Sequence, residues 1–148
     1  MSQPGLEVFD STLQKTHVWL NELREIAHLP DQQTSLKVLR AVLHALRDRL
    51  AVDVTAHLGA QLPMLVRGFF YEGWHPAGKP EKIRSQEEFL DQVRIRIVSP
   101  EVIDPARVTR AVFDLLNHHL SPGEPEKIRN VLPTELQELW PEPSPLYR

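Results

Sequence analysis

One stretch of this chain occurs twice, and the repetition constrains the fold more than any other feature of the sequence. Residues 40–63 begin with Arg-Ala-Val and end with Leu-Pro, and so do residues 110–133, at a constant offset of 70 positions. The offset places Leu46 on Leu116, with no insertion between the two landmarks. Self-similarity at a fixed offset indicates one supersecondary unit that is built twice. We therefore predict a tandem duplication with a period of roughly 70 residues.

The spacing of leucines predicts that each unit is helical. In residues 36–50, leucines recur at alternating steps of three and four positions, which places them along one face of a helix. The alternating residues 93–98 resemble a strand, but the aligned segment of the first unit has a helical pattern, so we expect a helix there too. The fold class predicted is all-α, with about four helices in each repeat.

Capping residues and prolines predict where the helices begin, because short polar side chains and an early proline suit the first turn. The expected caps are Ser11, Asp31, Asp53, Ser85, Asp104 and Ser121, and the first-turn prolines are Pro63 and Pro133. We expect one bundle-like domain over residues 9–141, with repeats at 9–74 and 85–141, a linker at 75–84, and loose termini at 1–8 and 142–148.

Composition excludes several classes of function. The chain has 148 residues, 41% of them hydrophobic and 25% charged, which are values of a globular domain. A net charge of -3 without a basic block disfavours a nucleic-acid binder. No run approaches ~20 apolar residues, so we expect no membrane span. The first residues have neither a basic start nor an apolar run, so we expect no signal peptide. The absence of cysteine fits a reducing compartment, and we predict a cytoplasmic protein.

The two repeats differ in the helix that follows the Leu-Pro landmark. Met64, Leu65, Phe69 and Phe70 make the first helix apolar nearly all round, whereas the helix predicted at 133–140 keeps a polar face. A helix that is apolar all round is buried on more than one side. We predict that helix 63–71 forms either the junction between the repeats or a surface for a partner.

An aromatic turn follows this helix and provides further candidate residues. Tyr71, Trp74 and His75 lie near a helix end, where they are able to line a pocket or form a binding hot spot. The alternative is that the same residues fold the linker back onto the core, with Trp74 as the plug. We favour this second interpretation.

Two His–Asp pairs raise the question of a metal site. His44 and Asp48 are one helical turn apart, and the repeat places Asp114 and His118 at the equivalent positions. Four such ligands related by a twofold axis are a possible zinc site if the two helices face each other. Spacing of four residues also gives an ordinary exposed pair on a helix surface, which is the interpretation we prefer.

The sequence contains no recognisable catalytic constellation. It has no cysteine, no nucleophile elbow of the G-x-S-x-G type and no glycine-rich phosphate loop. We therefore predict that the protein is not an enzyme, and we expect no cofactor.

Several segments together resemble a known family. They are residues 40–50, Gln61-Leu62-Pro63, Tyr71-Glu72-Gly73-Trp74, Leu132-Pro133 and Leu139-Trp140-Pro141. In combination they resemble the bacterial family catalogued as domain of unknown function 2267, over roughly residues 9–141. The resemblance implies a small, all-helical bacterial protein. It implies no activity, cofactor or catalytic residue.

Two classes of function remain open on the sequence. The first is a non-catalytic protein-interaction module, with self-association as one form, that uses helix 63–71 and the aromatic turn. The second is a carrier of a small apolar ligand with a pocket between the repeats. Metal binding is a distant third.

Overall fold

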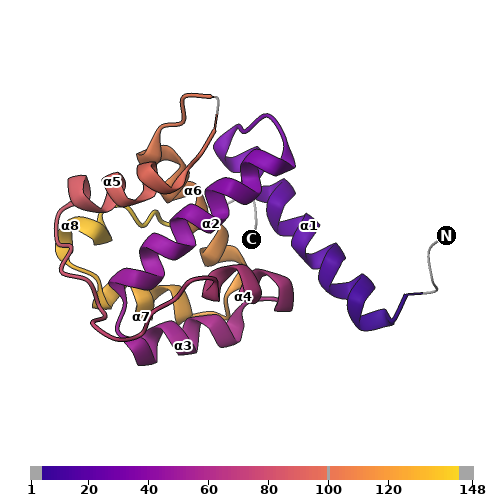
Figure 1. The fold of residues 1–148 in the computed structure, drawn as a ribbon, viewed down its shortest axis with the longest axis horizontal. Helices are drawn as coiled ribbons and strands as arrows, with labels where there is room; N and C mark the ends of the chain where they lie inside the picture. Colours follow the sequence, from indigo (N-terminus) through magenta and orange to yellow (C-terminus); the bar gives the residue numbers. More distant parts are fainter. Residues whose placement is uncertain (1–4, 100, 144–148) are drawn as a thin grey trace.

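The computed structural model describes residues 5–99 and 101–143, and these residues form eight α-helices without a strand (Figure 1). The helices are α1 (Glu7–Ala27), α2 (Gln32–Arg49), α3 (Val52–Gln61), α4 (Met64–Tyr71), α5 (Gln86–Arg96), α6 (Pro105–His119), α7 (Glu124–Val131) and α8 (Thr134–Gln137). The predicted all-α class is confirmed, and the strand-like segment 93–98 is helical as far as Arg96.

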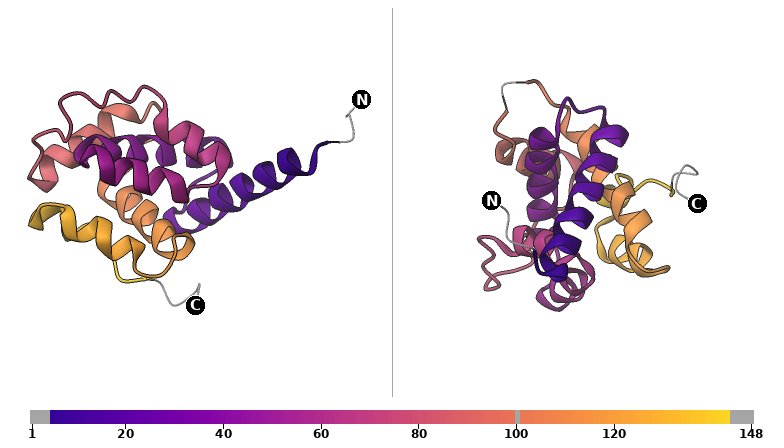
Figure 2. Two further views of the ribbon diagram at one scale, coloured as in Figure 1. Left: turned by 90° about the horizontal axis from the view of Figure 1, so that it is seen from below. Right: turned by 90° about the vertical axis from the view of Figure 1, so that its right-hand side faces the viewer.

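The packing of the first half (α1–α4) on the second (α5–α8) is reciprocal. α2 and α6 contact each other, α1 packs on α6, and α5 packs on α2 (Figures 1 and 2). The first helix of each half thus packs on the central helix of the other half, which is the arrangement that a twofold axis between α2 and α6 produces. The reciprocity fits the predicted duplication, which itself remains an interpretation of the sequence.

The leucine face of α2 lies at the centre of the hydrophobic core. Leu43 and Leu46 are fully buried, as are their counterparts Phe113 and Leu116 on α6. The Phe113 ring also stacks on Trp140, with 4.2 Å between the ring centroids. Fully burying a side chain of this size contributes roughly 1.5–3 kcal/mol. The core cluster draws on both halves of the chain.

Three of the predicted N-caps are confirmed. Asp31 accepts a hydrogen bond at 2.8 Å from the backbone N–H three residues further on. Ser85 and Glu88 form a complete capping box, in which each side chain accepts a hydrogen bond from the other residue's backbone N–H. Asp104 accepts from the N–H two residues on at 3.0 Å, and proline follows it at the first helical position. These local hydrogen bonds fix where α2, α5 and α6 begin.

The predicted start of α1 is wrong. The helix begins at Glu7, so Ser11 lies inside it and residues 7 and 8 do not belong to a loose leader. The acidic side chains Glu7 and Asp10 occupy the first turn, where carboxylates interact favourably with the helix dipole. These residues extend the helix upstream of the serine.

Two other predicted caps are also wrong. Asp53 is the second residue of α3 and makes no capping hydrogen bond. Its carboxylate lies in the first turn, near the positive end of the helix dipole. At α7 the N-cap is Gly123, which has a φ of 88° that favours glycine. Ser121 uses its carbonyl and not its hydroxyl, and accepts a hydrogen bond from the Glu124 N–H.

The second half ends in a shorter helix than predicted. α8 spans only four residues, whereas the sequence predicted a helix from Pro133 to Trp140. Leu139 and Trp140 are nevertheless buried, in the turn that follows α8. Helical geometry is therefore not needed to bring these side chains into the core.

The N-terminal part of α1 projects beyond the body of the protein (Figures 1 and 2). Its C-terminal part packs on α2 and α6, and the helix ends at His28, whose left-handed backbone (φ 55°) allows closing hydrogen bonds to carbonyls of the last turn. Of the helices described, none has the length and apolar character needed to cross a membrane.

Candidate functional site

Helix α4 buries most of its apolar surface within its own half of the chain. Phe70 is fully buried, Leu65 and Phe69 are half-buried, and Met64 is exposed (58%). The main packing partners of α4 are α1, α2 and α3. The prediction that this helix forms the junction between the repeats is therefore wrong, since α1 and α2 form that junction with α5 and α6. Three helices of the same half surround α4, which accounts for its apolar character.

The aromatic turn after α4 folds back toward the core. The Tyr71 ring lies 5.1 Å from the Phe70 ring and 5.4 Å from the Trp74 ring. Tyr71 also rests on Gly59 of α3, where a Cβ atom would collide with the tyrosine hydroxyl. Trp74 is half-buried, whereas His75 is exposed. The geometry matches the interpretation in which Trp74 anchors the linker.

Asp48 is at the centre of a buried ion cluster on α2. It accepts hydrogen bonds from Arg47 Nε at 2.8 Å and from Arg96 Nη2 at 3.1 Å. Arg47 Nη1 also donates to the carbonyls of Phe70 and Glu72, at 2.9 and 2.6 Å. The interpretation of Asp48 as half of an exposed His–Asp pair is therefore wrong. Its partners are two arginines, and the cluster ties α2 to the end of α4 and to α5.

His44 is directed to a backbone atom and not to Asp48. Its Nε2–H donates to the carbonyl oxygen of Phe69 at 2.6 Å. Burial lowers the pKa of His44 below its ordinary value of 6.5, and the nearby Arg47 and Arg40 act in the same direction. The hydrogen bond to Phe69 opposes this shift. A neutral imidazole at this position is thus part of the native structure.

The lowered pKa of His44 predicts a loss of stability in weak acid. The unfolded chain takes up a proton on this residue near pH 6.5, whereas the folded protein does so only at lower pH. Well above pH 6.5 His44 is neutral in both states and contributes no pH dependence. As the pH falls from 6.5 toward the folded pKa, the free energy of unfolding is expected to decrease. Urea titrations at several pH values measure this decrease.

The matched variants for this prediction are His44→Gln, which keeps a side-chain N–H donor, and His75→Gln at an exposed site. The first is expected to flatten the pH dependence of the unfolding free energy, and the second to leave it unchanged. An unaltered profile in His44→Gln contradicts the assignment.

In the second half, different residues hold the segment that follows α8 against α6. His118 Nε2 and Asp114 Oδ1 are 3.6 Å apart, and both side chains are nearly buried. At the position equivalent to Arg47, Asn117 donates to the Pro141 carbonyl at 3.0 Å and accepts from Trp140 Nε1 at 2.7 Å. This His–Asp pair is also buried, contrary to the preferred interpretation of an exposed pair.

The four metal-ligand candidates do not form a metal site. Within residues 5–99 and 101–143, no group of three or more His, Asp or Glu side chains is arranged to hold an ion. His44 and Asp48 are directed to Phe69 and to arginines, and do not converge with Asp114 and His118 on one point.

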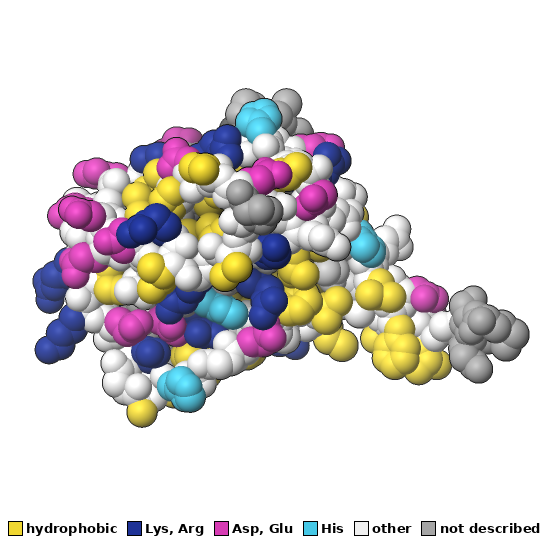
Figure 3. Space-filling view, turned by 45° about the horizontal axis from the view of Figure 1, so that its top comes forward, with side chains coloured by type: hydrophobic (Ala, Val, Ile, Leu, Met, Phe, Trp, Pro, Cys, Tyr) yellow, Lys and Arg dark blue, Asp and Glu magenta, His cyan; other side chains and the backbone are white. Residues whose placement is uncertain are grey.

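The apolar stripe on α1 begins at Leu6, within residues that were predicted to be a loose terminus. Leu6, Phe9 and Leu13 are exposed by 62%, 58% and 50%, and the space-filling view shows hydrophobic side chains gathered on this projecting end (Figure 3). We call residues 6–13 the α1 arm. The stripe continues through Thr16 and Leu20, which are buried against the body. The steps of three and four that begin at Leu6 were the signal available in the sequence.

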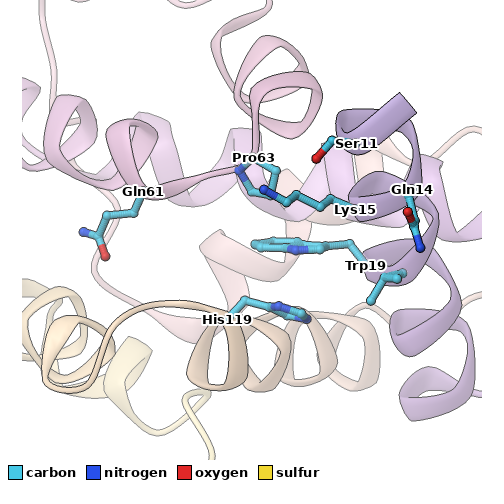
Figure 4. A pocket seen from close by; sticks show the side chains of 8 residues that line it. Ser11, Gln14, Lys15, Trp19, Gln61, Pro63 and His119 are labelled. Atoms are coloured by element: carbon cyan, nitrogen blue, oxygen red, sulfur yellow. The ribbon is translucent and has the colours of Figure 1, made fainter. Parts of the chain in front are cut away.

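A groove runs along the other side of the arm. Two adjoining pockets of about 470 and 390 Å³ share Ser11, Lys15, Gln61 and Pro63. The larger lies between α1, the turn from α3 to α4, and the end of α6 (Figure 4). Its lining mixes apolar and polar side chains, so the groove suits an amphipathic occupant.

A stacked ring pair forms the floor of this groove. The Trp19 ring lies on the His119 ring at 4.6 Å (Figure 4). His119 Nε2 is 2.6 Å from Glu22 Oε2. Trp19 is only 3% exposed, so the pair joins α1 to α6. No sequence motif indicated this contact, since the partners are a hundred positions apart along the chain.

Comparison with known proteins adds a family and no activity. The model of a family described as "Uncharacterized conserved protein (DUF2267)" matches residues 16–139. None of the curated proteins matches the chain.

Proposed function

The chain belongs to the DUF2267 family of uncharacterized conserved proteins, and from the geometry of the α1 arm we propose that it is a non-catalytic protein-interaction module that self-associates. The observation that carries the proposal is the exposed stripe of Leu6, Phe9 and Leu13 on a helix that projects from the body. Large apolar side chains gathered on one exposed surface mark an interaction site more often than a free one.

The continuity of the stripe favours a helix as the partner that covers the α1 arm. From Leu6 to Ala27 the stripe keeps steps of three and four, which is the spacing of a helix–helix seam. The body covers the half that includes Leu20 and Leu23, while the arm half lies open. A second helix laid on the arm would extend the same seam.

A second copy of this chain supplies such a helix. In a twofold dimer each arm presents the same patch to the other, so that the stripe is self-complementary. Phe9 of one copy then packs between Leu6 and Leu13 of the other, in antiparallel orientation. The interface is small, which predicts a weak and concentration-dependent dimer.

Other properties support the same proposal. The buried ion cluster and the aromatic contacts of the described side chains hold helices together, which is a structural role. The chain has no cysteine, which fits a reducing bacterial cytoplasm as its location.

Replacing Phe9 with glutamate is expected to weaken the dimer by about tenfold or more, because it removes a large apolar contact and places a charge in the seam. The folded monomer should be unaffected, since Phe9 is 58% exposed. Sedimentation equilibrium over a concentration series measures the dissociation constant, and a thermal melt checks the fold.

Ile95→Glu is the matched control, because Ile95 is equally exposed (64%) and lies on α5. This variant should dimerise like the wild type. The proposal fails if the wild type stays monomeric at the highest soluble concentration, or if both variants reduce association equally.

The groove beside the arm supports the second candidate function, a carrier of a small ligand. Its larger pocket lies between α1 and α6, and hence between the two halves, which supports this candidate. Lys15, Gln14 and Gln61 make part of its lining polar, which fits an amphipathic ligand better than a purely apolar one. Fatty acids of increasing chain length, added while Trp19 fluorescence is recorded, test this function. A saturable change that Trp19→Phe abolishes supports it, and no change excludes it for this ligand class.

A further inference from the structure

Two pockets lie at equivalent places in the two halves of the chain. The first, of about 360 Å³, is lined by Lys37, Arg40, Ala41, His44, Arg96 and Val98. The second, of about 310 Å³, includes Arg107, Arg110, Ala111, Asp114 and Ile26 in its lining. Each of these five residues stands 70 positions from one that lines the first pocket, so the two form a pair. We call them the first and the second basic pocket.

The chemistry of the two pockets differs. In the second, Asp114 and Glu142 are among the lining residues, so carboxylates accompany its arginines. Among the described residues the first has no lining carboxylate, a histidine stands where the second has Asp114, and an arginine stands where the second has Ile26. The first pocket is therefore the more cationic of the two.

Neighbouring carboxylates only partly neutralise the first pocket. Arg96 lies 3.1 Å from Asp48, which also pairs with Arg47. Arg40 lies 2.9 Å from Glu72. Lys37 adds a further cation at the exposed edge. Lys37 also interacts with the Asp31 carboxylate. Four cations thus face three carboxylates in this region, and the local charge stays positive within a chain whose net charge is -3.

Arg40 retains donor capacity for a ligand. Its guanidinium lies over the Phe69 ring at 5.7 Å, and its Nε is buried without a hydrogen-bond partner among the described residues. An arginine has five N–H donors in a planar fork that matches phosphate oxygens. An oxyanion in the pocket would supply a further acceptor for this guanidinium.

We propose that the first basic pocket binds a small phosphate-bearing anion. Arg40, Arg96 and Lys37 provide charge-assisted hydrogen bonds to the phosphate oxygens. His44 uses its Nε2–H on the Phe69 carbonyl, so its Nδ1 is the ring nitrogen left to accept from the hydroxyl of a monohydrogen phosphate. The volume accommodates a phosphate group with a short substituent.

Lys37→Gln is expected to weaken phosphate binding by about tenfold, the usual effect of losing one hydrogen bond to a charged group. Lys37 is exposed, so the fold should persist. Calorimetric titration of the full chain with inorganic phosphate and with glycerol phosphate, at constant ionic strength in a phosphate-free buffer, measures the affinities. Backbone amide spectra locate the site, with the largest shifts expected at Ala41 and His44.

The second pocket provides the matched control. Arg107→Gln replaces the residue equivalent to Lys37, and it should change phosphate affinity less than about twofold. Arg40→Gln should weaken phosphate binding as much as Lys37→Gln does. The fold should persist in this variant, because the Arg40–Glu72 ion pair is about half exposed and its loss costs little stability.

Binding of either phosphate compound that depends on Lys37 and Arg40 supports the proposal. It is overturned if neither compound binds more tightly than chloride, or if the amide shifts lie away from α2. Equal losses in Lys37→Gln and Arg107→Gln also overturn it, because they indicate attraction to the general charge of the chain.

Discussion

Replacing Asp48 with alanine is expected to lower the free energy of unfolding by roughly 3–5 kcal/mol, because the change leaves a buried guanidinium without its counter-ion. The Arg47 side chain is only 5% exposed and lies 2.8 Å from Asp48. Its bonds to the carbonyls of Phe70 and Glu72 remain in the variant, but they supply no negative charge. Arg96 loses its carboxylate as well. Urea denaturation measures the loss.

Asp91→Ala is the matched control for this prediction. Asp91 pairs with Arg94 on the surface of α5, where both side chains are more than half exposed. Exposed pairs of this kind are worth ~0–1 kcal/mol, so the control should unfold almost like the wild type. A cost for Asp48→Ala that is as small as that of the control would show that Arg47 reaches solvent.

The double variant Arg47→Met, Asp48→Leu separates charge from packing. Replacing a buried ion pair by apolar side chains of similar volume is often neutral or stabilising. The double variant is therefore expected to be more stable than Asp48→Ala. If it is less stable, the hydrogen bonds from Arg47 to the end of α4 contribute more than the pairing of charges.

Leu46→Ala and Leu116→Ala are each expected to cost roughly 2–5 kcal/mol, because each leaves a cavity in a packed core. Both leucines are fully buried, at equivalent positions of α2 and α6. Since these helices contact each other at the junction of the two halves, either change should lower the stability of the whole core. Urea and thermal unfolding, followed by circular dichroism, measure the effect.

Leu13→Ala is the control, since Leu13 is 50% exposed on the α1 arm. At a dilution where the chain is monomeric, it should change stability by less than about 0.5 kcal/mol. A loss confined to one half, seen as two separate transitions in Leu46→Ala, would contradict a shared core.

The sequence predicted the fold where local and periodic signals agree. The leucine steps of α2 and the caps Asp31, Ser85 and Asp104 depend on residues within a few positions, so their patterns are visible in the chain. Ser11 and Ser121 have the same local spacing as Ser85 and yet cap no helix. A capping pattern is only one contribution to where a helix begins.

The candidate site was less predictable than the fold. Helix 63–71 was singled out for its apolar residues, but only Met64 among them is exposed. The exposed apolar stripe lies on α1, partly in residues assigned to a leader. Apolar content reveals how much surface an element needs to cover, and it does not reveal which neighbours are close enough to cover it.

The sequence alone determined that the chain is helical, where most of its helices lie, and which leucines of α2 and α6 enter the core. These properties follow from side-chain periodicity and from hydrogen bonds between residues a few positions apart. The tertiary structure alone decided that Asp48 pairs with two arginines and that His44 donates to a carbonyl of α4. It also decided that Leu6, Phe9 and Leu13 are exposed to solvent. Burial and charge pairing depend on contacts between residues such as Asp48 and Arg96, which are distant in sequence and meet only when α2 packs on α5.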